Sequence, residues 1–322
     1  MILKNELVSA AALLAAVSFA HAQSYPVKTI TLVVPAPAGG PTDIIGRLVG
    51  QILTPQLGQN VIVDNRSGAG NTLGTEYVAK SKPDGYTLTV GSPSSHSIAP
   101  SIYKNLPYDP VRDFTPVVFL ATSPTVLVIH PSLPARTLKE FIVLAKAKPG
   151  DLNFGSGGNG TTSHLTGEYF KMAAGVKITH VPYKGSGPAT TDLLAGQIQM
   201  MFHGLHLSLP YIRSGKLRGL GLTSPKRSPL MPELPTISEA GLRGFEVNTW
   251  YGILGPAGLP KDVVARLNGA ILKGMENPAM RQRMVDQGLD IIGSTPEQFA
   301  KVIADEKAKW AKVVQQSGAR VD

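Results

Sequence analysis

The order of expected elements constrains this 322-residue chain more than any other feature: a β-branched strand, a glycine-rich turn and a helix follow one another repeatedly. The first unit has an apolar run at 29–34, a Gly- and Pro-rich turn at 35–41, and an amphipathic segment from Thr42 to about Leu57. Short apolar runs bounded by turns are typical of buried parallel strands. Alternation at this spacing predicts an α/β protein with a largely parallel sheet.

The same order recurs along the chain, and the irregular stretch 110–116 divides it into two blocks. Further strands are expected in apolar runs at 61–63, 86–90, 117–120, 125–129, 152–154, 178–181, 200–202, 218–222 and 250–254. Further helices are expected at 72–80, 138–147, 161–173, 189–195, 260–275, 278–287 and 296–316. Two α/β units of similar design are therefore expected, joined by a Pro- and Gly-rich connector at 225–245, with the last helices packing on the first unit.

The amino terminus predicts export. Lys4 precedes an apolar run from Leu7 to Ala20, and an Ala-His-Ala cleavage motif follows. This run is shorter than the roughly 20 apolar residues that span a bilayer. We therefore expect residues 1–22 to be a signal peptide cleaved near Ala22/Gln23, and the mature protein to be periplasmic; a buried amphipathic helix is the alternative.

Charge and cysteine usage narrow the classes of function. The chain has no Cys, which excludes disulfides, thiolate metal sites and cysteine nucleophiles. Its formal net charge is +9, but it has no dense Lys/Arg run and only 6% aromatic residues, so we do not expect it to bind nucleic acid. A weak positive field favours small anions or an acidic surface as partners.

Two glycine-rich turns carry the predicted site. Gly39 and Gly40 precede Pro41 and the first helix, and the loop 155–160 precedes hydroxyl residues at 161–163. Free backbone N–H groups at a helix N-terminus bind carboxylate or phosphate without a charged side chain. Ordinary turns use the same residues, but two such loops in separate units can grip both ends of a diacid.

Dinucleotide binding is one alternative for the second loop. Gly155, Gly157 and Gly160 match the spacing of the dinucleotide fingerprint, after a strand and before a helix. The acidic residue that binds the ribose should follow about 20 residues later. Residues 177–180 are Lys, Ile, Thr and His, so that acid is missing and we expect no cofactor.

A metal site is a second alternative. His203 and His206 are spaced to approach one metal, and Glu168 or His164 would have to complete the ligand set. Nothing in the sequence brings these residues together, and nucleophile-elbow, P-loop and HEXXH motifs are all missing. We therefore expect neither a metal nor an enzyme.

A series of segments carries a resemblance to a known family. They lie at 25–26, 33–43 (VVPAPAGGPTD), 63–70, 83–88, 106–110, 153–156, 164–165, 181–185, 192–196, 215–218, 232–236 and 255–258. In this order they resemble the Bug family, solute receptors similar to those of tripartite tricarboxylate transporters. The resemblance implies a type II periplasmic-binding-protein fold, with two α/β lobes, a two-stranded hinge and a ligand in the cleft. Lobe 1 is expected at 23–121 and 246–322, and lobe 2 at 122–245.

The resemblance also implies a set of ligand-binding residues, in which the turn 38–43 holds one carboxylate through backbone amides, a hydroxyl and bridging waters. The full expected set is Ala38, Gly39, Gly40, Thr42, Asp43, Ser92, Ser94, Gly155, Ser156, Gly158, Asn159, Thr161, Thr162, Tyr183, Gly185 and His203. Two residues depart from the family pattern. Ala36 replaces the usual Phe and reshapes the pocket, and His203 replaces a frequent Asp and adds a donor or a charge that titrates near pH 6–7.

These features together predict a monomeric receptor for a small organic anion, a mono-, di- or tricarboxylate. The ligand would shift the equilibrium between open and closed forms by its differential affinity for them. The closed form would then dock on membrane permease subunits. Presentation of that form to a sensor kinase and an exported enzyme are the alternatives.

Overall fold

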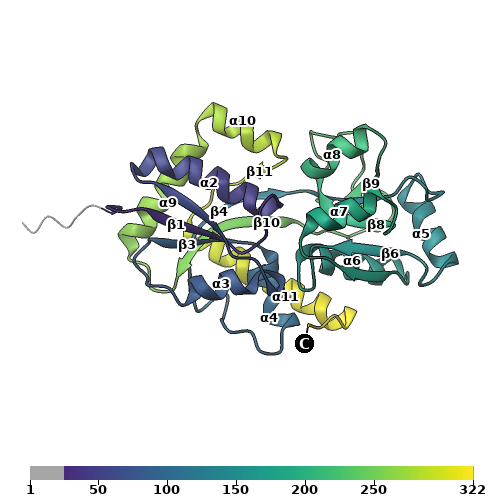
Figure 1. The fold of residues 1–322 in the computed structure, drawn as a ribbon, viewed down its shortest axis with the longest axis horizontal. Helices are drawn as coiled ribbons and strands as arrows, with labels where there is room; N and C mark the ends of the chain where they lie inside the picture. The colour runs from purple at the N-terminus through teal and green to yellow at the C-terminus, as the bar shows by residue number, and fades with distance from the viewer. Residues whose placement is uncertain (1–24, 322) are drawn as a thin grey trace, which may run out of the picture.

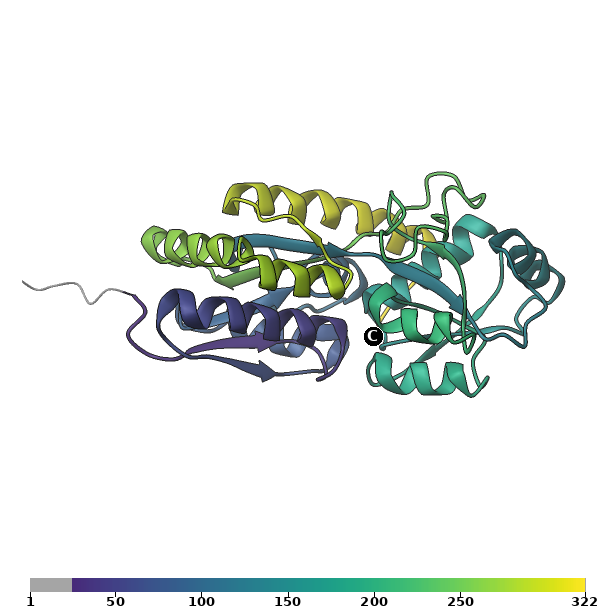
Figure 2. The ribbon, with the colours of Figure 1, turned by 90° about the horizontal axis from the view of Figure 1, so that it is seen from above.

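The computed structural model describes residues 25–321, which form two α/β lobes side by side, each built on one sheet (Figure 1, Figure 2). The first sheet consists, in spatial order, of β11 (Asp290–Ile291), β4 (Phe114–Ser123), β10 (Thr249–Pro256), β3 (Thr87–Gly91), β1 (Ile30–Val34) and β2 (Val61–Asn65). The second consists of β7 (Thr179–Pro182), β6 (Asn153–Ser156), β8 (Met200–Gly204), β5 (Thr125–Ile129) and β9 (Arg218–Leu222). The predicted α/β class is confirmed.

Helices cover both sheets. The first lobe carries α2 (Pro41–Leu57), the short turn η2 (Ala69–Asn71), α3 (Thr72–Ala79), the π-helical turn η3 (Ser94–Ile98), α4 (Ala99–Ile102), α9 (Lys261–Met275), α10 (Pro278–Asp286) and α11 (Pro296–Ser317). The second lobe carries α5 (Leu138–Ala147), α6 (Thr162–Ala174), α7 (Ser186–Leu194) and α8 (Leu205–Arg213). Among residues 25–321, no helix combines the length and the apolar character needed to cross a membrane.

The prediction of a largely parallel sheet is wrong. β1 pairs parallel with β2 and β3, and β6 pairs parallel with β7 and β8. In contrast, β10 runs antiparallel to β3 and β4, and β5 runs antiparallel to β8 and β9. The cause is the connection between the lobes, because the strands that carry the chain across and back run in opposite directions.

The crossing between the sheets is short. Pro124 alone separates β4 from β5, and the return passes from Thr223 through the connector to β10. Thr249 of β10 pairs with Ser123 of β4, and the hydroxyl oxygens of Thr125 and Thr249 lie 3.3 Å apart. The two crossings therefore lie next to each other, as a two-stranded hinge requires.

The amphipathic pattern of α2 explains the core of the first lobe. Its residues Ile45, Leu48, Val49 and Ile52 are buried and belong to the same cluster as Leu32 of β1. α2 begins at a proline, which suits the first helical turn, and ends before Gly58, whose φ of 67° is a left-handed conformation that glycine adopts freely.

The last helix, α11, packs on both lobes. Phe299 and Ile303 in its first half join the first-lobe cluster around Trp250. Trp310 and Val314 in its second half join a cluster that contains the core of the second lobe together with Ile98 and Ile102 of the first. Figure 1 shows this yellow helix reaching below α6. The tail therefore packs on the first unit as expected, since the Val321 N–H also donates to the Ile102 carbonyl oxygen at 3.1 Å, but the second half of α11 contacts the second lobe as well.

Gly252 of β10 provides a test of this packing. A Cβ at this position would lie 2.2 Å from Phe299 Cζ and 2.7 Å from the carbonyl oxygen of Val118. We expect Gly252→Ala to lower the free energy of unfolding by about 3 kcal/mol, because the core is overpacked. Gly269→Ala is the matched control, since nothing lies within 4 Å of a Cβ there and the exposed helical site should gain up to about 1 kcal/mol. Urea unfolding measures both, and a Gly252→Ala protein as stable as wild type would contradict the packing of α11 on β10.

Candidate ligand-binding cleft

A cavity of about 470 Å³ lies between the two lobes. The first lobe contributes the turn before α2 and the residues that follow β3, and the second contributes the turns before α6 and α7 and the end of β8. Hydroxyl groups form much of the wall, among them Ser94, Thr162 and Thr190, and Leu194 and Leu207 add an apolar patch. Ligands of open α/β sheets bind at the carboxyl ends of strands, which is where this cavity lies.

Two helix N-termini from opposite lobes face each other across the cavity. Neither α2 nor α7 has a side-chain cap. Within residues 25–321, the N–H groups of Gly40 and Thr42 on α2 and of Ser186 and Gly187 on α7 have no hydrogen-bond partner. A Cβ at Gly40 would lie 3.9 Å from Ser186 Oγ, so the two N-termini are close together. Both therefore direct free donors and a positive helix end at the same space.

Asp43 stabilises the turn before α2 from a position outside the cavity wall. Its Oδ2 accepts hydrogen bonds from the Gly39 N–H and from Arg47 Nε, both at 2.9 Å, and its Oδ1 accepts one from Asn65 Nδ2 at 3.0 Å. Burial opposes ionisation, but the hydrogen bonds from Arg47, Gly39 and Asn65 hold the pKa of this carboxyl below its usual value. Asp43 does not line the cavity, and it uses the N–H of Gly39 itself.

The lobes also touch each other through residues of the cavity wall. Ser94 Oγ accepts a hydrogen bond from the Thr162 N–H at 2.9 Å and pairs with Thr162 Oγ1 at 2.9 Å. A Cβ at Gly70 of η2 would lie 2.7 Å from the carbonyl oxygen of Asn159. The cleft is thus bridged by direct contacts between first-lobe and second-lobe backbone and side chains.

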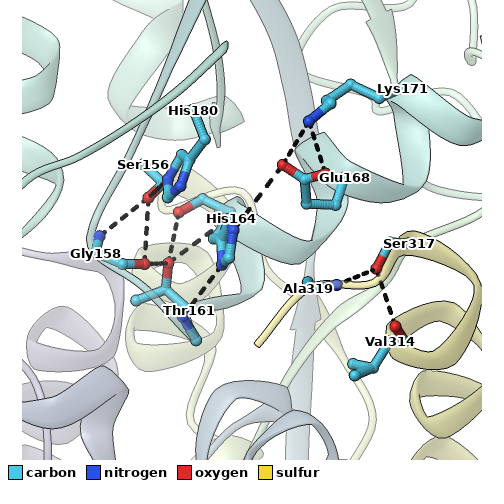
Figure 3. Close-up of polar contacts among 12 residues, drawn as sticks. Ser156, Gly158, Thr161, His164, Glu168, Lys171, His180, Val314, Ser317 and Ala319 are labelled. Atoms are coloured by element: carbon cyan, nitrogen blue, oxygen red, sulfur yellow. Dashed lines mark hydrogen bonds and ion pairs between the residues drawn. The ribbon is translucent and has the colours of Figure 1, made fainter. Parts of the chain in front are cut away.

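The loop 155–160 is folded onto its own lobe by two histidines, buried His164 and half-buried His180 (Figure 3). Ser156 Oγ lies 2.6 Å from His180 Nε2, the Gly160 N–H donates to His164 Nδ1 at 3.2 Å, and the two imidazole rings stack at 4.0 Å. Burial lowers the pKa of His164 to about 4 and that of His180 to about 3. Both rings are therefore neutral near pH 7, which leaves Nδ1 of His164 free to accept.

Most residues of the predicted set do line the cavity. They are Ala38, Gly39, Gly40, Thr42, Ser92, Ser94, Thr161, Thr162, Gly185 and His203. The others do not: Asp43, Gly155, Ser156, Gly158, Asn159 and Tyr183.

The residues that do not line the cavity have structural partners instead. Gly155 packs inside the second lobe, where a Cβ would lie 2.3 Å from Ile198. Tyr183 donates its hydroxyl to Asp192 Oδ2 at 2.7 Å. Gly158 accepts a hydrogen bond from Thr161 through its carbonyl oxygen. Glycine-rich spacing located the loop, but it does not distinguish residues that face the cleft from those that fold the turn.

Sequence reasoning missed part of the second-lobe wall. Ser186 and Gly187 directly follow the predicted site residue Gly185, but their free N–H groups depend on where α7 begins. Leu207 and Tyr211 line the cavity from α8, a helix that the sequence did not predict because Pro210 lies inside it.

His203 lies in the wall and is only 6% exposed. Its Nδ1 pairs with Ser208 Oγ at 2.9 Å. Burial, with a smaller contribution from His206, lowers its pKa to about 4. The expected titration near pH 6–7 is therefore corrected to one near 4, and the imidazole is a neutral group at physiological pH. In the part of the chain that the structure describes, no three His, Asp or Glu side chains are grouped to hold a metal ion.

A family model described as "Tripartite tricarboxylate transporter family receptor" matches residues 45–319. Among curated relatives, Protein BugT of Bordetella pertussis is 37% identical over 93% of this chain and 92% of its own.

Two similar solved structures are described with ligands. One is "R. palustris Rpa4515 with adipate", with a TM-score of 0.88 and 36% identity, covering 92% of this chain and 100% of its own. The other is MatC (Rpa3494) from Rhodopseudomonas palustris with bound malate, with a TM-score of 0.85 and 35% identity, covering 90% of this chain and 100% of its own.

Proposed function

Because the chain belongs to the tripartite tricarboxylate transporter receptor family, with BugT among its relatives, we propose that it captures a small carboxylate in the cavity between its lobes. The resemblance to the Bug family and the two-lobe binding-protein fold are confirmed by these matches. One observation carries the proposal: two uncapped helix N-termini, one from each lobe, converge on the same cavity. Such a pair binds a carboxylate with neutral donors.

Further features support a carboxylate as the ligand. Two similar solved structures are described with adipate and with malate, both of which are carboxylates. The formal net charge of +9 adds a weak attractive field for anions. We assign ligand contacts to the residues that line the cavity, chiefly the amides of Gly40, Thr42, Ser186 and Gly187.

The mechanism that we propose is closure followed by transfer. A ligand that contacts both lobes binds the closed form more tightly and shifts the population toward it by that difference in affinity. We propose that the protein works in the periplasm and that its closed form delivers the ligand to a membrane permease. The description of the family as a transporter receptor favours this over sensing. The lobe limits at 121/122 and 245/246 remain a prediction.

Titration calorimetry with a panel of acids tests the proposal. The panel contains acetate, succinate, malate, adipate and citrate, added to purified protein at about pH 7. We expect one-to-one binding of at least one acid with a dissociation constant of about 1 μM or below, typical of a well-formed enclosed site. Folded protein that binds none of these acids would contradict the proposed function.

A further inference from the structure

We propose that the cavity selects carboxylates whose remaining groups are neutral, either hydrocarbon or hydroxyl, and that it rejects α-amino acids. This inference rests on the proposed function, since it names the class of carboxylate that the same cavity accepts. It follows from the charges around the cavity and from the state of its hydrogen-bonding groups.

The wall offers no counter-charge for an ammonium group. Among the described residues, none of those lining the cavity is Asp or Glu, and the one charged side chain is that of Lys184, which is itself positive. His203 is either neutral or positive and therefore adds no negative charge. The N-termini of α2 and α7 contribute further positive potential. An ammonium group enclosed here would be desolvated without an ion pair, which is strongly unfavourable.

Two carboxylates that are chain neighbours of cavity-lining residues already have hydrogen-bond partners. Asp43 lies behind the first turn and accepts hydrogen bonds from Gly39, Arg47 and Asn65. Asp192 of α7 accepts the hydroxyl proton of Tyr183 at 2.7 Å. Neither residue lines the cavity, so neither can pair with a ligand cation unless these bonds break.

The acceptors that the wall does offer suit a hydroxyl group. Thr190 donates its hydroxyl proton to the carbonyl oxygen of Ser186 at 2.8 Å, and Thr166 donates to that of Thr162 at 2.7 Å. Since these protons are committed, each threonine oxygen remains only as an acceptor. A neutral oxygen accepts a hydrogen bond from an alcohol, but it does not compensate a full positive charge.

Matched pairs of acids test the inference. Malate and aspartate have the same carbon skeleton and differ in a hydroxyl against an ammonium group. So do 2-hydroxyglutarate and glutamate, and 3-phenyllactate and phenylalanine. In calorimetric titrations of the wild-type protein at about pH 7, we expect the amino acid of any binding pair to be at least about 100-fold weaker than the hydroxy acid. An amino acid within about threefold of its partner, or tighter, would overturn the selectivity while leaving the proposed function intact. If no acid of any pair or of the earlier panel binds, both proposals fall.

A charge introduced into the wall gives a second test. His203→Asp places a carboxylate in the cavity. We expect it to reduce the ratio between the dissociation constants of the amino acid and its matching hydroxy acid by about tenfold or more. His203→Asn, of similar size and uncharged, should change both members of a pair alike and keep the ratio. A folded His203→Asp protein with the wild-type ratio would contradict the electrostatic explanation. The wild-type ratio decides the question if the Asp variant does not fold.

Discussion

A Gly40→Val protein is expected to bind carboxylate at least about 100-fold more weakly than wild type, a loss of about 2.7 kcal/mol. Gly40 has a φ of −84°, so an L-residue adopts this backbone without strain. A Cβ there would lie 3.5 Å from the Pro37 carbonyl oxygen and 3.9 Å from Ser186 Oγ, which are ordinary contacts. The two methyl groups of valine must then occupy the gap between α2 and α7, where we place the carboxylate.

Gly40→Ala is the matched control for this effect. Its single methyl group sits at van der Waals distance and leaves most of the gap open, so its loss of affinity should be much smaller. The valine change also removes a favourable cap residue, which lowers the free energy of unfolding by at most about 1 kcal/mol. Calorimetry with the best acid, together with urea unfolding, separates the two effects. Wild-type affinity in the valine variant would remove this gap from the binding site.

The free energy of unfolding is expected to fall steeply as the pH drops from about 6.5 to about 4.5. Burial lowers the pKa of a group of histidines to about 3 or 4: His96, His164, His180, His203 and His206. In the unfolded chain their pKa returns to about 6.5. Below that pH the unfolded state binds protons that the folded state does not. Their stabilising contribution is therefore full above about pH 6.5 and is lost as the pH falls toward 4, with a slope of up to about 1.4 kcal/mol per pH unit for each histidine.

Urea unfolding at a series of pH values between about 7.5 and 5 measures this slope. His206→Gln is a useful variant because both ring nitrogens of His206 are buried without a hydrogen-bond partner among the described residues. Removing this histidine should reduce the slope by up to about 1.4 kcal/mol per pH unit. Stability that stays constant between pH 7 and 5 would contradict neutral burial of the histidines.

Local pattern was enough to predict the elements that position the site. The turn 35–41 and the amphipathic run after it located α2 and its open N-terminus, because proline and glycine restrict the backbone locally. The pattern did not reveal strand direction, since β10 pairs with β3 and β4 from far along the chain. In this protein β1, with parallel neighbours, and β5, with antiparallel neighbours, are both buried apolar runs, so the pattern alone does not separate the two cases.

The details of the site that the sequence did not reveal also depend on contacts between distant parts of the chain. Asp43 was expected to contact the ligand, whereas its partners are Arg47 one turn later and Asn65 on another strand. The hydrogen bond between Ser94 and Thr162 joins residues that are 68 positions apart. Such tertiary pairings decide whether a polar side chain faces the cleft or the protein interior, and residue spacing carries no record of them.

The position of α11 across both lobes has a consequence for the rate of ligand binding. This helix places Phe299 in a first-lobe cluster and Trp310 in a cluster with residues of both lobes, so we expect separation of the lobes to expose part of the second cluster. This exposure adds to the free-energy cost of separating the lobes. If ligand entry requires the lobes to separate, the association rate constant should lie below the diffusion-controlled range and should rise in variants that weaken the packing of Trp310.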